Sequence, residues 1–298
     1  MSLRRLVVIF INLLLCNFIY SSNNSIKDTN FIKKDRIIIV GSVLSASTLG
    51  SYFYVKNKWW DEKHADFHFD RGADLTYALN VDKAGHFIGG LQFSDGFSSA
   101  MIWAGMNRQK SYWYGALFGS SIQLAIEIKD GYAPYWGFST WDLAAGSIGS
   151  LWPVSQYYYS DLQAINFKFS YYKRSDIYWQ LETQRGKEVG NYVWQDDYVN
   201  QTYWATFDLN HYINNCCWPE WLNLAVGFGL DDNQYLKNGT KMGGNNEWYI
   251  ALDYDISKLL KKWQSPLGRN IKFFLKYFHL PAPTIRIFPD VEFYPLFL

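Results

Sequence analysis

Three long stretches of the chain are almost free of charged residues, and each carries a polar cluster at one end. The stretches cover 84–107, 111–128 and 141–159, and the clusters are Asp82–His86, Glu127–Gly131 and Phe138–Asp142. Small residues recur within them at spacings of three or four: Gly96, Ala100, Ala104, Gly115, Gly119, Gly146 and Gly149. Such spacing lets helix backbones approach closely. The pattern therefore predicts three tightly packed helices with their polar ends gathered together.

A fourth stretch, 37–55, contains no charged residue and is long enough to span a bilayer. Its several serines make it only moderately hydrophobic, so a buried helix of the same bundle is an open alternative. The segment 56–81 that follows is charged and aromatic, and it contains His64 and His68. It predicts a loop on a surface or an interface.

The second half of the chain has a different periodicity. Apolar residues alternate with mostly polar ones over 165–171, 203–209 and 248–256, which predicts strands with one face buried. The segments 222–230, 271–278 and 284–288 are less regular strand candidates. Tyr and Trp are dense throughout, as in belts at a lipid–water interface. The expected fold class is α+β: a membrane-associated bundle of about four helices over 37–160, then a β-rich aromatic part over 161–298 that forms a small sheet packed on the helices.

The first residues are typical of a secretory signal over 1–22. Arg4 and Arg5 precede the apolar run Leu6–Leu15, and small residues follow at Ser21 and Ser22. An uncleaved membrane anchor is the alternative. A flexible leader is expected over 23–36, because this segment is rich in Ser, Asn, Asp and Lys.

Composition excludes some classes of function. The formal charge of +1 gives no support for binding nucleic acid. The adjacent Cys216 and Cys217 would close a strained ring, so no disulfide is expected between them. We find no Ser-centred nucleophile motif and no Gly-rich phosphate loop, and we expect no cofactor.

Charges at the ends of apolar helices need partners, because burying an unpaired charge costs several kcal/mol. Lys83 in a first helical turn and Glu127 in a last turn both face the unfavourable end of the helix dipole. An antiparallel hairpin would place Lys83 and His86 against Glu127 and Asp130. Gly131 is expected to be a C′ residue that ends the second helix. Asp82 is expected to cap its helix, and Ser139 with Asp142 has the spacing of a capping box.

The predicted polar network consists of Asp82, Lys83, His86, Glu127, Asp130, Ser139 and Asp142. Three interpretations stay open. His86 could act as a general base with Glu127 or Asp142 orienting it, so these three are the hypothetical catalytic residues. His86, Glu127, Asp130 and Asp142 could bind a divalent ion, although we assign no metal. The network could also be structural and fix the helix register. His211 and His279 show no ligand partner at useful spacing.

The ordered set Asp82-Lys83-x-x-His86, Glu127-x-x-Asp130 and Phe138-Ser139-x-x-Asp142 resembles the YfiM-like predicted periplasmic lipoproteins, the domain of unknown function 2279. The run Gly131–Ser139 resembles longer forms from Bacteroidetes, and the motif order has a remote likeness to VanZ-like membrane proteins.

The resemblance implies an exported envelope protein of a Gram-negative bacterium, facing the periplasm and associated with the outer or inner membrane. Its partners would be membrane lipid or an envelope protein, in a structural or binding role. The alternative is a membrane-proximal acid–base hydrolase or transferase that acts on a lipid-linked or cell-wall substrate.

Overall fold

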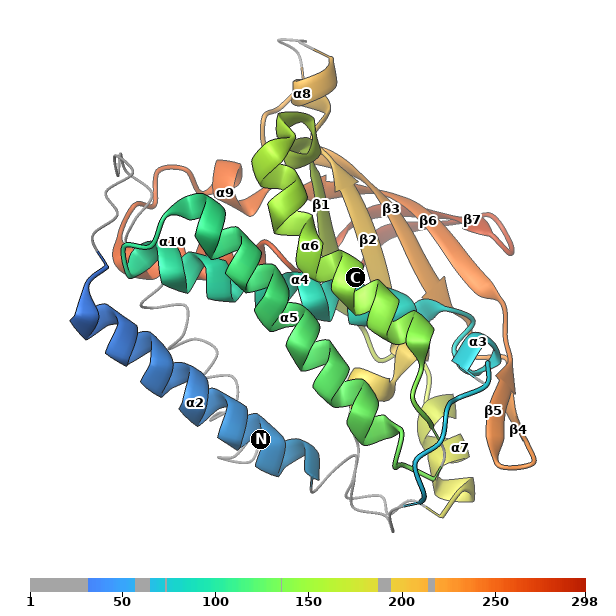
Figure 1. Cartoon of the computed structure of the whole chain (residues 1–298). Coiled ribbons are helices and arrows are strands. Elements are labelled where there is room, and N and C mark those ends of the chain that lie inside the picture. Colours follow the sequence, from blue (N-terminus) through green and yellow to red (C-terminus); the bar gives the residue numbers. More distant parts are fainter. Residues whose placement is uncertain (1–31, 57–64, 73, 135, 187–193, 214–217) are drawn as a thin grey trace.

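The computed structural model describes residues 32–56, 65–72, 74–134, 136–186, 194–213 and 218–298. The expected signal over 1–22, most of the expected leader, His64, Cys216 and Cys217 lie outside these residues. Within them the protein is α+β, with helices first and an antiparallel sheet after them. Figure 1 shows the helices in front of the sheet.

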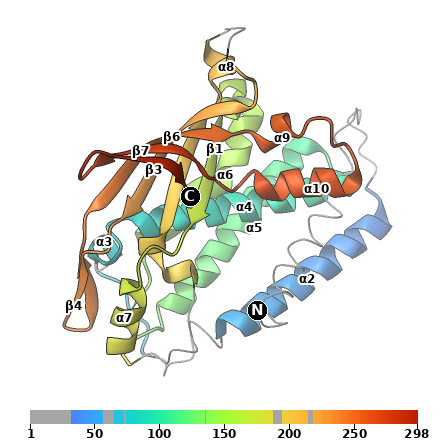
Figure 2. The ribbon, with the colours of Figure 1, turned by 180° about the vertical axis from the view of Figure 1, so that it is seen from behind.

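Four long helices form the first half, as predicted. They are α2 (Lys34–Lys56), α4 (Val81–Trp103), α5 (Arg108–Asp130) and α6 (Thr140–Tyr158), with a single turn, α3 (Asp74–Tyr77), before α4. Helices α4, α5 and α6 pack against one another along their lengths. Figures 1 and 2 show α2 to one side of this group. The compact unit is therefore a three-helix bundle with α2 attached to it.

Helix α2 is attached near one end. Val40 packs on Ala100 and Trp103, and Arg36 donates a hydrogen bond of 2.6 Å to the Trp103 carbonyl. Val40 is the one buried residue of Lys34–Phe53. This segment is long and apolar enough to cross a membrane, by length and composition alone. Helix α2 begins at Lys34, three residues before the predicted start at residue 37.

Glycines bring the three packed helices together. A Cβ added to Gly149 of α6 would lie 1.9 Å from the Phe87 carbonyl oxygen of α4. A Cβ on Gly115 of α5 would lie 2.0 Å from Ser98 Oγ, also on α4. Only hydrogen fits at such contacts, as the small-residue spacing predicts. Gly96 is an exception, because an added Cβ would have no atom within 4 Å.

The second half forms a six-stranded antiparallel sheet in the order β1-β2-β3-β6-β7-β8. Its strands are β1 (Ile165–Tyr171), β2 (Gln201–Phe207), β3 (Leu222–Leu230), β6 (Asn246–Tyr254), β7 (Ala282–Phe288) and β8 (Glu292–Phe297). A separate hairpin pairs β4 (Gln234–Lys237) with β5 (Thr240–Gly243). Short helices α7 (Ile177–Gln184), α8 (Leu209–Tyr212) and α9 (Ile256–Leu259) occupy the connections.

One predicted strand is wrong. The segment 271–278 lies mostly in helix α10 (Pro266–Leu275). Ser265 caps this helix by accepting a hydrogen bond of 3.1 Å from the Gly268 amide, and Pro266 follows in the first turn, where proline is favoured. Strand β8 was not predicted. It contains Pro295, which a strand tolerates at a sheet edge.

The alternation along the strands is present, and the buried face is the one that carries charged residues. On β6, Glu247 and Asp253 are buried, whereas Trp248 and Ile250 are exposed. On β1, the Lys168 side chain is buried. One face of each of these strands is therefore buried, and it is the more polar face.

The sheet curls around this polar face. The rings of Trp204 on β2 and Phe297 on β8 lie 6.1 Å apart, although four strand spacings of a flat sheet span about 19 Å. Trp204, Ala225, Tyr249 and Ala251 form a buried cluster inside the curl. On the outer face, Phe167 packs against Phe87 of α4 and Trp152 of α6. The bundle thus packs on the outer face at β1, and α4 also contacts β2 and β3.

Candidate functional site

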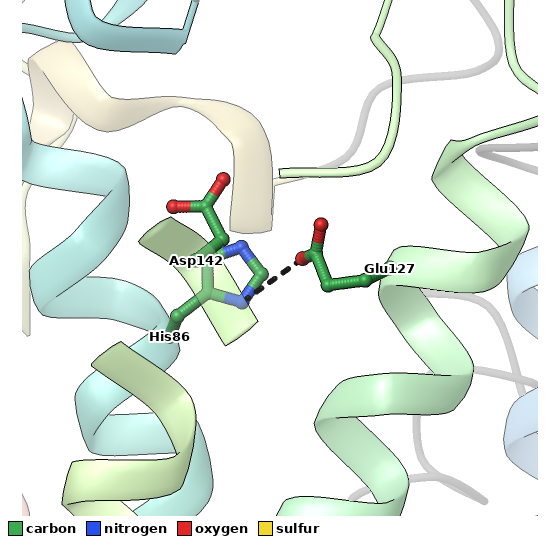
Figure 3. Close-up of side chains that lie close together, drawn as sticks. All are labelled: His86, Glu127 and Asp142. Atoms are coloured by element: carbon green, nitrogen blue, oxygen red, sulfur yellow. Dashed lines mark ion pairs between the residues drawn. The ribbon is translucent and has the colours of Figure 1, made fainter. Parts of the chain in front are cut away.

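Three helix ends meet at one place and bring His86, Glu127 and Asp142 together (Figure 3). His86 lies in the second turn of α4, Glu127 in the last turn of α5 and Asp142 in the first turn of α6. The antiparallel α4–α5 hairpin and the short loop before α6 produce this meeting. One ligating atom from each of the three side chains lies within 4.8 Å of the others.

Lys83 is held between two carboxylates. Its Nζ lies 3.0 Å from Asp142 Oδ1 and 3.1 Å from Asp82 Oδ2. Lys83 thus pairs with Asp142, whereas His86 lies toward Glu127. The Asp130 charge raises the pKa of Glu127, and the Asp130 carbonyl accepts hydrogen bonds from the amides of Ala133 and Gly137.

His86 makes a contact that the sequence analysis did not identify. Its Nδ1 lies 2.9 Å from Oε1 of Gln123, a buried residue one turn before Glu127. Glu127 Oε1 is 3.7 Å from the same nitrogen, too far for a hydrogen bond. The sequence does indicate Gln123, because it lies four residues before Glu127 and residues four apart share a helix face.

The start of α6 confirms Ser139 as the N-cap and corrects the capping box. Ser139 Oγ accepts a hydrogen bond of 3.1 Å from the Asp142 amide. In a capping box, the Asp142 carboxylate would accept a second hydrogen bond from the Ser139 amide. That amide instead donates to Glu127 Oε2 at 2.9 Å. Glu127 therefore replaces the acid of the box, and this leaves Asp142 to pair with Lys83.

Asp82 is not the N-cap of its helix. Helix α4 is preceded by Asn80, whose φ of 69° is left-handed, and Asp82 lies inside the first turn. Its Oδ1 accepts from the Lys83 amide at 2.9 Å. The structure thus uses Asp82 to hold Lys83.

A short extended segment covers the loop between α5 and α6. The amide of Ala65 donates to the Tyr132 carbonyl, and that of His68 donates to the Gly131 carbonyl, both at 2.9 Å. Gly131 has a φ of −57°, so it is not the left-handed C′ glycine that we expected. A glycine is required here because a larger residue would not fit: an added Cβ would lie 2.4 Å from the Phe67 ring.

Burial dominates the electrostatics of the carboxyl groups. Burial raises the pKa of Glu127 to about 8, against the lowering effects of His86 and the Ser139 amide. Burial and the Asp142 charge raise the pKa of Asp82 to about 6, although Lys83 opposes the shift. Burial alone would lower the pKa of His86, but Asp142 and Glu127 raise it on balance.

One carboxylate oxygen in this site has no hydrogen bond. Glu127 Oε1 is buried and accepts no hydrogen bond from any group that the structure describes. Buried polar atoms are normally satisfied, and an orphan costs about 1–3 kcal/mol. A purely structural network would have satisfied it, so the arrangement is suited to receive a proton or a ligand at this oxygen.

The raised pKa of Glu127 predicts that stability depends on pH. Between 4.5 and about 8, folded Glu127 holds a proton that the unfolded chain has released, so the free energy of unfolding falls as pH rises through this range. The expected loss is on the order of 3–5 kcal/mol. His86, Asp142 and Asp130 are the titratable groups that act on Glu127. Urea denaturation at pH 5 and pH 8 in the presence of a chelator measures this loss.

The control is Glu127→Gln, which mimics the protonated carboxyl group and cannot titrate. Its free energy of unfolding should change much less between pH 5 and pH 8 than that of the wild type. An equal pH dependence in both proteins would show that Glu127 does not titrate in this range.

A second group of buried charges lies inside the curl of the sheet. Lys168 Nζ is 2.7 Å from Asp253 Oδ2, and His279 Nδ1 is 3.1 Å from Asp253 Oδ1. His279, for which sequence spacing indicated no ligand partner, is thus paired with Asp253. The pair could not be identified from spacing, since 26 residues separate the two in sequence. His211 is also paired, at the surface, with Asp161 at 3.1 Å.

Residues 70–158 match the model of a family described as predicted periplasmic lipoprotein (DUF2279). This is the family that the polar motifs resemble, and the match includes the three helix ends of the site. No curated protein and no solved structure matches the chain. The resemblance is thus confirmed for residues 70–158, which leave out α2 and the sheet, and it supports an exported protein of the envelope, facing the periplasm.

Proposed function

We propose that this protein is a membrane-associated component of the cell envelope that contacts lipid through apolar outward faces of its helices and sheet. The observation that carries the proposal is an inverted distribution of polarity. Many polar and small residues lie inside the bundle and the curl of the sheet, beside buried aromatic residues such as Trp204 and Tyr249, while many large apolar residues lie outside. Soluble proteins rarely expose contiguous apolar patches of this kind.

Helix α5 has the clearest inversion. From Trp113 to Ile128 its exposed positions carry no charge: Trp113, Tyr114, Leu117, Ser121, Leu124, Ala125 and Ile128. Its buried positions are Ser111, Gly115, Ala116, Gly119, Gln123 and Glu127. Leu117 is 65% exposed. Small and polar residues at helix contacts with apolar residues outside are typical of helices packed in lipid.

The neighbouring helix and the sheet follow the same rule. Exposed large residues of α6 are Trp141, Ile148, Leu151, Tyr157 and Tyr158. Val226, Ile250, Ile285 and Phe293 occupy paired positions on β3, β6, β7 and β8 and are all exposed. They form one apolar row across the uncovered side of the outer face. Strands with an apolar outside and a polar inside favour the outer membrane as the location.

Flotation of the purified chain with vesicles of phosphatidylethanolamine and phosphatidylglycerol tests this proposal. The wild type should float with the vesicles, and Leu117→Lys with Leu124→Lys should reduce the bound fraction at least tenfold. The reason is that a lysine in the hydrocarbon costs about 2.5–3.5 kcal/mol.

The matched control is Tyr235→Lys. Tyr235 is also exposed, but it lies on the β4–β5 hairpin, which projects away from the bundle in Figure 1. This variant should float like the wild type. Equal flotation of all three proteins, or no flotation of the wild type, would contradict the proposal.

A further inference from the structure

We propose that His86, Glu127 and Asp142 form a binding site for one divalent transition-metal ion, with zinc as the ion that fits best. The proposal does not depend on lipid contact, and it revises our sequence-based expectation, which assigned no metal. It is based on the convergence of three ligand types, on an unsatisfied oxygen and on the balance of charge.

The ligand types and their spacing fit zinc. Imidazole and carboxylate are established zinc ligands, and a three-residue set leaves a fourth position for water. In a tetrahedral site with bonds near 2.1 Å, the ligating atoms are about 3.4 Å apart. The three side chains already offer atoms within 4.8 Å of one another. They come from three helices fixed by glycine contacts, so small side-chain rotations would close the site.

Glu127 Oε1 is free to bind an ion. The Glu127 side chain is only 2% exposed, and its other oxygen, Oε2, is occupied by the Ser139 amide. Oε1 accepts no hydrogen bond from the described residues and points toward the His86 ring in Figure 3. A buried oxygen that lacks a donor but faces a second ligand is suited to accept a metal bond.

The neighbours of the three residues also fit. When His86 Nδ1 donates to Gln123 Oε1, Nε2 keeps its lone pair for a metal, as in many sites where a second group orients the histidine. Lys83 occupies Asp142 Oδ1, so we assign Oδ2 to the ion.

The charges of the cluster also fit a divalent ion. Lys83 lies between Asp82 and Asp142, so Asp82, Lys83, Glu127 and Asp142 together have a net charge of −2 when all are ionised, which one divalent ion would balance. The imidazole favours zinc over the oxygen-seeking magnesium and calcium. His86 and Lys83 keep 18% and 14% of their side-chain surface exposed, which provides a route of entry.

The experiment uses the full chain in detergent, stripped with a chelator and titrated with Zn²⁺ in a calorimeter. We expect one zinc per chain, and weaker binding of Mg²⁺. Glu127→Gln and Asp142→Asn should each weaken zinc binding about a hundredfold or more. Asp161→Asn is the matched control, because it removes the carboxylate of the exposed His211–Asp161 pair. It should leave the affinity unchanged.

Cobalt substitution keeps the test decisive if a variant fails to fold. One equivalent of Co²⁺ added to the wild type should give visible absorption bands of a four-coordinate ion, and Zn²⁺ should abolish them. The proposal is overturned if the wild type binds no stoichiometric zinc. It is equally overturned if folded Glu127→Gln and Asp142→Asn retain wild-type affinity, or if only Asp161→Asn loses it.

Discussion

Lys168→Met is expected to lower the free energy of unfolding by about 3–5 kcal/mol. The Lys168 and Asp253 side chains are 4% and 0% exposed, and their charged atoms are 2.7 Å apart. Removing the ammonium leaves the Asp253 carboxylate buried beside His279, a histidine whose pKa burial lowers. Urea unfolding of the full chain in detergent, followed by tryptophan fluorescence, measures the loss.

Two further variants test whether burial is the cause. Lys261→Met removes an ion pair with Glu220, in which both side chains are about two-thirds exposed, and it should change stability by less than about 1 kcal/mol. The double variant Lys168→Met, Asp253→Asn removes both charges and keeps an oxygen for His279. It should recover more than about 1 kcal/mol relative to Lys168→Met. If Lys168→Met and Lys261→Met have equal effects, burial of the pair is not important.

Gly149→Ala is expected to lower the free energy of unfolding by about 3 kcal/mol or more, at the upper end of the usual cost of overpacking. The added methyl group would lie 1.9 Å from the Phe87 carbonyl oxygen, which belongs to the α4 backbone and cannot rotate away. Helices α4 and α6 would have to separate, and the contacts of His86 and Lys83 with the α5 and α6 ends would lengthen. Thermal unfolding compared with the wild type measures the effect.

Gly96→Ala is the control within the same bundle. The added Cβ would meet no atom within 4 Å. Alanine should therefore raise the free energy of unfolding by about 0.5–1 kcal/mol through its higher helix propensity. We therefore expect Gly149→Ala to lower the free energy of unfolding and Gly96→Ala to raise it. A similar loss in both variants would mean that the Gly149 contact with Phe87 does not hold the helices together.

Local patterns in the sequence were sufficient for much of the helical half. The charge-poor stretches predicted four long helices, because helix formation depends on residues a few positions apart. Ser139 was identified as an N-cap for the same reason, since the capping bond reaches only three residues ahead. The polar helix ends also indicated where charged groups would gather, because a buried charge requires a partner.

Several features depend on contacts between distant residues and could not be read from the sequence. Glu127 takes the capping bond expected of Asp142 because α5 ends beside the start of α6. The pairing of Asp253 with Lys168 and His279 arises only when three separate segments meet inside the sheet. Helix α10 replaced a predicted strand, because the Ser265 cap and tertiary packing outweighed the weak local pattern.

The sequence by itself determined where the long helices and most strands lie, because their periodicity is a local property. It did not determine which face of each strand is buried. An alternation such as that of Glu247, Trp248 and Tyr249 is the same whichever side turns inward. The curl of the sheet decided this by enclosing the face that carries the ion pairs together with Trp204 and Tyr249, and it left the opposite face outside.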